Sequence, residues 1–323
     1  MAETWTVRRL RAWVKEYLAA RAVESPLVCA DLLLAHVLNV DRMRLYMDPE
    51  RLATDAERDQ LRTLVQRAGQ HEPVQYLVGS WSFFGLELEV GPATLIPRPS
   101  TESLVSEAAN RLRPLVSAGT SVRVADFCTG TGCIAIALAR TLIAVRAGRR
   151  QLAWQRGSDV SDVNACAEPV QAPLEVHATE LVQEAVAIAR RNVERHGLSG
   201  VVTIYEGDLD RPLEARPLEN TFDLICANPP YISDAEWAAV PRNVRDYEPA
   251  AALRAGHDGF DLIRPIVARA SRWLRPGGSL LVEISSSQGA MALSLAGEAG
   301  LEEASILLDL EGHPRVLAAR ARV

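Results

Sequence analysis

The sequence predicts an α/β protein in which a doubly wound, mostly parallel sheet follows a small helical domain and a hairpin. Three observations predict this architecture. After residue 120, short apolar stretches alternate with helical patterns, as in parallel strands joined by helices. Before residue 75, apolar residues recur at helical spacing. Between these regions, apolar and polar residues alternate as they do in paired strands.

The helical domain is expected to span residues 1–75. Apolar residues from Leu10 to Leu18 follow helical spacing, and a second such pattern begins after the breaker Ser25-Pro26. A third pattern follows Thr54, a typical N-cap residue. Residues 76–101 are expected to form a hairpin and a hinge, because the alternating SWSFFGLELEV is followed by the proline-rich LIPRPST.

Residues 102–323 are expected to form the second domain. Its predicted strands are 122–127, 175–180, 202–208, 222–231 and 279–285, and its predicted helices are 128–140, 182–197 and 265–278. The polar, aperiodic stretch 146–173 lies between a helix and a strand. Such links lie at the amino ends of strands, away from the ligand crevice, so we expect a surface insertion without a catalytic role.

Composition excludes several classes of function. The net charge is −6, from 41 acidic and 35 basic residues, and no basic arm is present, which argues against a dedicated nucleic-acid binder. The five cysteines form no Cys-x-x-Cys pair and no histidine stands at metal-ligand spacing, so we expect no disulfide scaffold and no metal. Without a signal-peptide core or a membrane-spanning apolar run, the protein is expected in the cytoplasm.

A glycine-rich turn joins the first predicted strand of the second domain to its helix. It contains Asp126, Cys128, Thr129, Gly130, Thr131 and Gly132. The glycines let the backbone turn tightly and approach a ligand, with helix-initial N–H groups facing it. Asp126 would repel a pyrophosphate but would hold an ammonium group. S-adenosylmethionine carries an amino-acid group and a sulfonium, so the turn favours it over a dinucleotide.

Two acids follow at the ends of the next two strands. Glu180 ends the strand 175–180, where its carboxylate is placed to accept both hydroxyls of a ribose. Asp208 follows the next strand and is placed to accept the amino group of adenine. Each acid by itself is also typical of a solvated strand end, so both assignments depend on the glycine turn.

The strand that begins at residue 222 ends in the motif Asn228, Pro229, Pro230 and Tyr231. Two prolines cannot continue a central strand, because each lacks an N–H donor and has a fixed φ. The chain must therefore break at the carboxyl end of the strand, facing the crevice. The rigid turn presents the Asn228 side-chain oxygen and the Pro229 carbonyl, which together can hold both hydrogens of an –NH₂ group.

This arrangement predicts methyl transfer to a planar amide or amine nitrogen. The leaving thioether needs no acid, so catalysis consists of positioning and of stabilising the charge that grows on nitrogen. Acceptors on both amide hydrogens favour a pyramidal nitrogen. Tyr231 is expected to form an apolar wall over the target, and no side chain is predicted to act as a strong general base.

With these motifs the chain resembles the HemK/PrmC-type release-factor glutamine methyltransferases nearly from end to end. Further blocks that carry the resemblance are EPVQYLVG (72–79), FFGL (83–86), LIPRP (95–99), NVRDYEP (243–249), GHDG (256–259), LRPGG (274–278) and DLEG (309–312). The resemblance implies a Rossmann-like class I methyltransferase domain that uses S-adenosylmethionine. It implies methylation of N5 of the glutamine in the Gly-Gly-Gln loop of peptide-chain release factors, with the helical domain helping to bind the release factor.

The resemblance also assigns roles. It implies that the cofactor is contacted by Thr129, Gly130, Thr131, Gly132, Glu180, Asp208 and Asn228, with Asp126, Cys128 and Leu209 in the same site, and that residues 228–231 hold the substrate amide. The chain departs from the family pattern at several of these positions. Cys128 replaces a glycine, Glu180 an aspartate, Ser100 a hinge glutamate, and Leu209 an aromatic residue that some members place against adenine.

Three other functions stay open at this point. A diverged paralogue would methylate a nitrogen of a small molecule or of another protein. A second possibility, a nucleic-acid methyltransferase, would modify the amino group of a base, although the acidic balance of the chain argues against it. The third is a binding protein that kept the fold after Cys128 impaired cofactor binding.

Overall fold

The computed structural model describes residues 4–148 and 173–323. The chain divides into two compact units. One contains the residues up to Ser80 together with Val240–Tyr247, and the other contains Trp81–Ala239 and Glu248–Val323. Most of the predicted insertion at 146–173 lies outside the described residues. Among the helices that the structure describes, none is long and apolar enough to cross a bilayer.

The amino-terminal unit is helical. Its helices are α1 (Val7–Ala19), α2 (Pro26–Leu38), α3 (Arg42–Met47), α4 (Asp55–Ala68) and α5 (Val74–Val78), and the short α9 (Arg242–Arg245) belongs to the same unit. The buried faces of α1 to α5 meet in one core around Leu18, Leu33 and Val65. The predicted cap at Thr54 is confirmed, because Thr54 and Glu57 form a reciprocal capping box. Tyr247 donates a hydrogen bond to the Gln70 carbonyl over 2.8 Å, which ties the later segment to this unit.

The second unit contains a seven-stranded sheet. Its strands are β3 (Val122–Phe127), β4 (Leu174–Glu180), β5 (Val202–Glu206), β6 (Phe222–Ala227), β7 (Leu274–Glu283), β8 (Glu302–Leu308) and β9 (Pro314–Arg320). They lie in the order β5-β4-β3-β6-β7-β9-β8, and β9 is antiparallel to both of its neighbours. The five predicted parallel strands are confirmed, but β7 begins at Leu274, within the stretch 265–278 that was expected from the sequence to be a helix. The last two strands were not predicted.

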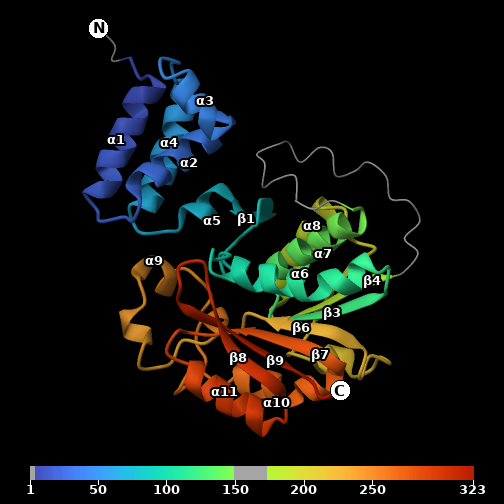
Figure 1. Cartoon of the computed structure of the whole chain (residues 1–323). Coiled ribbons are helices and arrows are strands. Elements are labelled where there is room, and N and C mark those ends of the chain that lie inside the picture. The colour runs from blue at the N-terminus through green and yellow to red at the C-terminus, as the bar shows by residue number, and fades with distance from the viewer. Residues whose placement is uncertain (1–3, 149–172) are drawn as a thin grey trace. The chain divides into compact units, whose positions relative to one another are not determined.

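Helices cover both faces of this sheet (Figure 1). Those of the second unit are α6 (Thr101–Ser117), α7 (Cys133–Arg146), α8 (Gln183–Arg195), α10 (Ile263–Trp273) and α11 (Gly289–Glu298), with single 3-10 turns at Arg211–Leu213, Trp237–Ala239 and Ala250–Ala252. Helices α6, α7 and α8 cover one face, and α10 and α11 cover the other. This is the doubly wound, class I arrangement that the sequence predicts.

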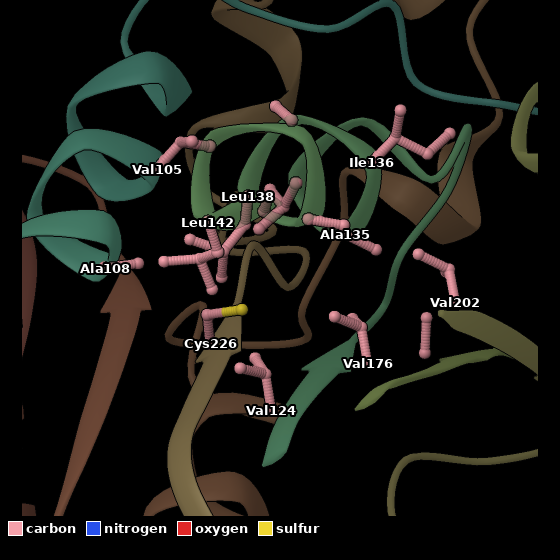
Figure 2. Packing of buried hydrophobic residues seen from close by; sticks show 14 of the residues in the cluster. Val105, Ala108, Val124, Ala135, Ile136, Leu138, Leu142, Val176, Val202 and Cys226 are labelled. Atoms are coloured by element: carbon pink, nitrogen blue, oxygen red, sulfur yellow. The ribbon is translucent and has the colours of Figure 1, made fainter. Parts of the chain in front are cut away.

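The most buried helix is α7, which is apolar on almost every side. It packs beside α6 on the same face of the sheet, where Leu138 and Leu142 belong to one cluster with Val105 of α6 and Cys226 of β6 (Figure 2). A helix that is apolar all round is stable only when it is enclosed in this way. The burial fixes the start of α7, and with it the glycine-rich turn, over the end of β3.

The predicted hairpin precedes α6. Strands β1 (Ser80–Phe83) and β2 (Leu86–Glu89) are joined by Phe84 and Gly85, which have φ values of 52° and 74°. Two consecutive residues with positive φ form the type of turn that matches the twist of a two-residue hairpin. The inward side chains of β2 join the core on the α6 side of the large sheet.

Candidate active site

The motifs predicted from sequence meet in a pocket at the carboxyl ends of the parallel strands. Its walls are formed by Cys128–Thr131 after β3, Thr179–Val182 at the end of β4, Gly207–Leu209 after β5, Asn228 and Pro230 after β6, and parts of segment 93–101. The pocket holds about 910 Å³ of space, open solvent included. Parallel strands end at one edge of a sheet, and loops that are distant in sequence meet there because of this geometry.

The glycine-rich turn forms the floor of the pocket. Gly130 has φ of 56°, and a Cβ built on it would meet no described atom within 4 Å, so a side chain there would project into the pocket. Gly132 has φ of 81° and serves as the N-cap of α7. A Cβ on Gly132 would approach Ile136 to 3.1 Å, and the residue does not line the pocket. Gly130 therefore leaves space for a ligand, and Gly132 adopts the positive φ that the turn before α7 requires.

Asp126 lies beneath the turn instead of facing the pocket. It is fully buried and accepts hydrogen bonds from the Thr129 hydroxyl at 2.6 Å and from the Ala135 amide at 3.2 Å. Burial raises the pKa of this carboxyl to about 7, against the opposing effect of those donors. Asp126 therefore links the turn to the first turn of α7 by these two hydrogen bonds. Asp126 does not line the pocket, whereas it was expected from the sequence to contact a ligand ammonium there.

The Glu180 carboxylate hydrogen-bonds to the backbone of the glycine-rich turn and of the segment that follows β4. One carboxylate oxygen accepts the Gly130 amide at 2.9 Å, and the other accepts the Val182 amide at 3.0 Å. Each carboxylate oxygen has a second lone pair, so both remain able to accept a hydroxyl from the pocket. Glu180 lines the pocket, as the sequence predicts for an acid that binds a ribose.

Replacing Glu180 by alanine is expected to weaken S-adenosylmethionine binding by about 1–3 kcal/mol, because it removes one or two hydrogen bonds to a charged acceptor. Isothermal titration measures this loss. Glu206→Ala is the matched control, since Glu206 is the neighbouring strand-end acid, is exposed, and does not line the pocket. Equal affinity in wild type and Glu180→Ala would remove Glu180 from the site.

The end of β5 supplies the far wall. Asp208 lines the pocket and lies 3.5 Å from the guanidinium of Arg211. Leu209 also lines it, is buried, and adopts φ of 48°. A non-glycine residue is strained in the left-handed region of backbone conformation, so the surrounding structure must hold Leu209 in this conformation. An apolar side chain beside an acceptor suits a flat heterocycle with an amino group.

Cys128 has φ of 59°, a left-handed backbone conformation that favours glycine. Left-handed backbone costs a non-glycine residue roughly 1–2 kcal/mol, so this cysteine is strained. The side chain lines the pocket and packs against the core on the α10 side. Burial, and next to it the charge of Glu180, raise the pKa of the Cys128 thiol well above its ordinary value. A thiol that stays protonated is a poor nucleophile.

Cys128→Gly is expected to keep or raise activity and to increase the free energy of unfolding slightly, because it relieves this strain. Thermal unfolding and methyl-transfer rates test the expectation. Cys133→Gly is the matched control in the same pocket: Cys133 begins α7 with helical φ, so glycine should cost about 1 kcal/mol there. Loss of turnover in correctly folded Cys128→Gly would indicate a chemical role for the thiol.

The proline motif leaves β6 beside the pocket. Asn228 and Pro230 line it, whereas Pro229 and Tyr231 do not. The Asn228 amide nitrogen donates to the Thr101 hydroxyl at 3.1 Å, which leaves its Oδ1 as the acceptor. Tyr231 packs against the core of the second unit, and burial raises its pKa to about 12. Its ring thus lies outside the walls of this pocket.

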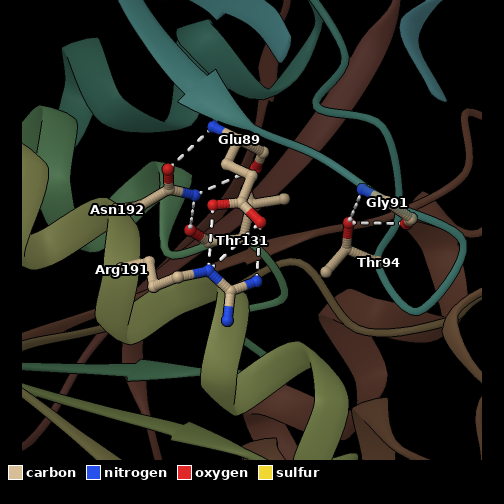
Figure 3. Close-up of polar contacts among 6 residues, drawn as sticks. All are labelled: Glu89, Gly91, Thr94, Thr131, Arg191 and Asn192. Carbon is tan, nitrogen blue, oxygen red and sulfur yellow. Dashed lines mark hydrogen bonds and ion pairs between the residues drawn. The ribbon is translucent and has the colours of Figure 1, made fainter. Parts of the chain in front are cut away.

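Two supporting side chains were not predicted from sequence, and both bind backbone. Asn192 of α8 accepts from the Glu89 amide at 2.7 Å and donates to the carbonyls of Glu89 and Thr131, each at 3.0 Å (Figure 3). Gln288 donates to the carbonyls of Tyr231 at 3.1 Å and Gly259 at 3.0 Å. Asn192 thus couples the glycine turn to the hairpin, and Gln288 fixes the end of the proline motif.

The segment expected as a hinge is fixed to the second unit and forms a pocket wall. Leu95, Pro97 and Thr101 line the pocket. Arg98 forms an ion pair of 2.5 Å with the buried Glu248, whose other oxygen accepts the Ile96 amide at 3.1 Å. A buried carboxylate that is paired in this way holds its neighbours in place. The proline-rich composition predicted a break in regular structure, but it did not predict that Glu248 would bind Arg98 and the Ile96 amide.

Comparison with known proteins agrees with this geometry. Residues 9–79 match the family model described as the PrmC N-terminal domain, and residues 118–238 match the RMKL-like methyltransferase domain. A release factor glutamine methyltransferase of Rhodopirellula baltica is 34% identical over 98% of this chain and 99% of its own length. One of Geobacter sulfurreducens is 36% identical over 98% of each chain. The chain belongs to the release factor glutamine methyltransferase family.

A solved member of this family is also similar. The protein-(glutamine-N5) methyltransferase of Alicyclobacillus acidocaldarius is 25% identical, with a TM-score of 0.37 over 73% of this chain and 100% of that one. The matched methyltransferase domain, 118–238, includes the glycine-rich turn, Glu180, Asp208 and the proline motif. Thr101, Gly259 and Gln288 lie outside this match and complete the same region of the fold.

Proposed function

We propose that this chain transfers a methyl group from S-adenosylmethionine to N5 of the glutamine in the Gly-Gly-Gln loop of peptide-chain release factors. The observation that carries the proposal is the position of Asn228 at the pocket edge, in a chain that relatives of this activity match over nearly full length. Release factors act on ribosomes, so we also propose that the enzyme works in the cytoplasm.

The residues around the pocket fit S-adenosylmethionine. Gly130 leaves open space next to backbone N–H groups, and the acids Glu180 and Asp208 stand on the walls at the ends of β4 and β5. Asp208 and Leu209 together suit the adenine, and Glu180 suits the ribose. When bound, S-adenosylmethionine supplies the methyl group on a positively charged sulfur. The chain's own residues then have to hold the acceptor nitrogen.

Asn228 and Pro229 are the residues to which we assign this task. The Asn228 Oδ1 and the Pro229 carbonyl accept the two hydrogens of the glutamine amide. Both are oxygen acceptors on a proline-stiffened turn, so they need little reorganisation during the reaction. As charge develops on the amide nitrogen, these partial negative charges stabilise it. The surplus proton leaves to water after the transfer.

A comparison of methyl acceptors tests the proposal. The protein is incubated with methyl-labelled S-adenosylmethionine and, in parallel, with the cognate release factor, with total RNA and with DNA. We expect label on the release factor alone, and none on a release factor whose Gly-Gly-Gln glutamine is replaced by alanine. Label on nucleic acid, or equal label on both release-factor forms, would contradict the proposed substrate.

A further inference from the structure

A chain of polar contacts runs from the proline motif to a buried acid that the proposed reaction does not use. Asn228 follows β6, and Glu283 ends β7, the neighbouring parallel strand. The first residue of α6, Thr101, accepts the Asn228 amide nitrogen at 3.1 Å. Ser100, directly before it, donates to Glu283 Oε1 at 3.4 Å. The start of α6 therefore bridges Asn228 and Glu283.

Two residues of this bridge, Thr101 and Glu283, are buried. Thr101 is 1% exposed and Glu283 is 0% exposed. The Thr101 hydroxyl and Glu283 Oε1 have hydrogen-bond partners that constrain their orientation, whereas Glu283 Oε2 has none among the described residues. Burial raises the pKa of Glu283 to about 7, and the hydroxyls of Thr101 and Ser100 act in the opposite direction as donors to its charged form.

The direction of these hydrogen bonds decides how the Asn228 amide is turned. While Glu283 is ionised it only accepts, and the Thr101 hydroxyl, as a donor to its charged form, then directs its single proton away from Asn228. The Thr101 oxygen then offers a lone pair to Asn228, which the amide nitrogen can meet and the amide oxygen cannot. Flipping the Asn228 amide would set two oxygens against each other. The observed donation from Asn228 Nδ2 to Thr101 agrees with this polarity.

We infer that Thr101 and Glu283 are positioning residues that fix the Asn228 side-chain amide with its oxygen toward the substrate. This inference rests on the proposed function, because it supplies the orientation that amide binding requires. Without it, Asn228 would present a donor to the two hydrogens of the substrate amide for part of the time. Neither residue needs to touch the reacting atoms.

Thr101→Val tests the inference, because it removes the hydroxyl and keeps the shape of the side chain. Its single-turnover methyl-transfer rate should fall about 10–100-fold at saturating S-adenosylmethionine and release factor, with cofactor affinity within threefold of wild type. Thr101→Ser should restore the rate. Thr141→Val is the matched control, since Thr141 is also buried and its hydroxyl bonds the Ala137 carbonyl inside α7. A Thr101→Val rate within twofold of wild type would overturn the inference.

A double-mutant cycle tests the route through Thr101. Glu283→Gln replaces the acceptor-only carboxylate by a group that also donates, and the rate should fall. Added to Thr101→Val, Glu283→Gln should have little further effect, because both changes release the same amide. Fully additive losses would show that Glu283 does not act through Thr101 and would overturn its assignment.

One readout requires no methyl acceptor. In ¹⁵N-labelled protein, the Asn228 side-chain amide protons should exchange slowly in wild type and Thr141→Val, and at least tenfold faster in Thr101→Val. Equal exchange in wild type and Thr101→Val would overturn the inference whatever the substrate is. If wild type methylates no release factor but the exchange rates differ as expected, the proposed function fails and the positioning of Asn228 stands.

Discussion

Asn228→Ala is expected to lower kcat by about 10²–10³, the usual effect of losing one preorganised electrostatic partner in an active site. Release-factor affinity should change little, because the amide's alignment matters chiefly in the transition state. Single-turnover rates at saturating S-adenosylmethionine measure the effect, since Asn228 also lines the cofactor pocket. Asn110→Ala, an exposed change on α6, is the control. A near-normal rate for Asn228→Ala would rule out its proposed role.

Gly259→Ala is expected to have the second-largest effect. Gly259 has φ of 80°, and a Cβ there would lie 2.3 Å from the Tyr231 carbonyl oxygen and 2.6 Å from Gln288 Nε2. The Tyr231 backbone or the Gly259 segment must therefore shift, because the nearest atom belongs to the backbone of the proline motif. We expect a loss of about 2–4 kcal/mol in the free energy of unfolding, from overpacking and backbone strain together. The displaced motif should also lose about 10² in rate.

Gly300→Ala separates the two contributions to this loss. Gly300 has φ of 70°, but a Cβ there would meet no described atom within 4 Å, so alanine adds strain without a clash. Urea denaturation should show a loss of roughly 1 kcal/mol for Gly300→Ala, with an unchanged methyl-transfer rate. If the two alanine variants unfolded and reacted alike, the tight contact between Gly259 and Tyr231 would have no functional importance.

The sequence located the motifs because each has a local cause. Glycines in the turn and prolines at 229 and 230 restrict the backbone whatever lies around them, so their place at strand ends could be predicted. Glu180 ends the strand-like stretch EVHATE (175–180), so its strand-end position could also be predicted. These elements needed no knowledge of distant contacts.

The remaining parts of the site depend on contacts across the chain. Asp126 was expected to face a ligand, but the Thr129 hydroxyl and the Ala135 amide turn its carboxylate inward. Asn192 lies 103 residues from the Glu89 backbone that it binds, and no local pattern indicates such a pair. Strands β8 and β9 were missed because their pairing is antiparallel, at the edge of a sheet read as alternating strands and helices.

The most direct test of the proposed reaction is the site of the methyl group on the release factor. After reaction with S-adenosylmethionine carrying a deuterated methyl, the release factor is digested and the Gly-Gly-Gln peptide is fragmented by tandem mass spectrometry. We expect one labelled methyl on the glutamine, at its side-chain nitrogen, in the wild-type reaction and its near absence with Asn228→Ala. A methyl on oxygen, on carbon or on another residue would contradict it, because two acceptors suit a target with hydrogens on nitrogen.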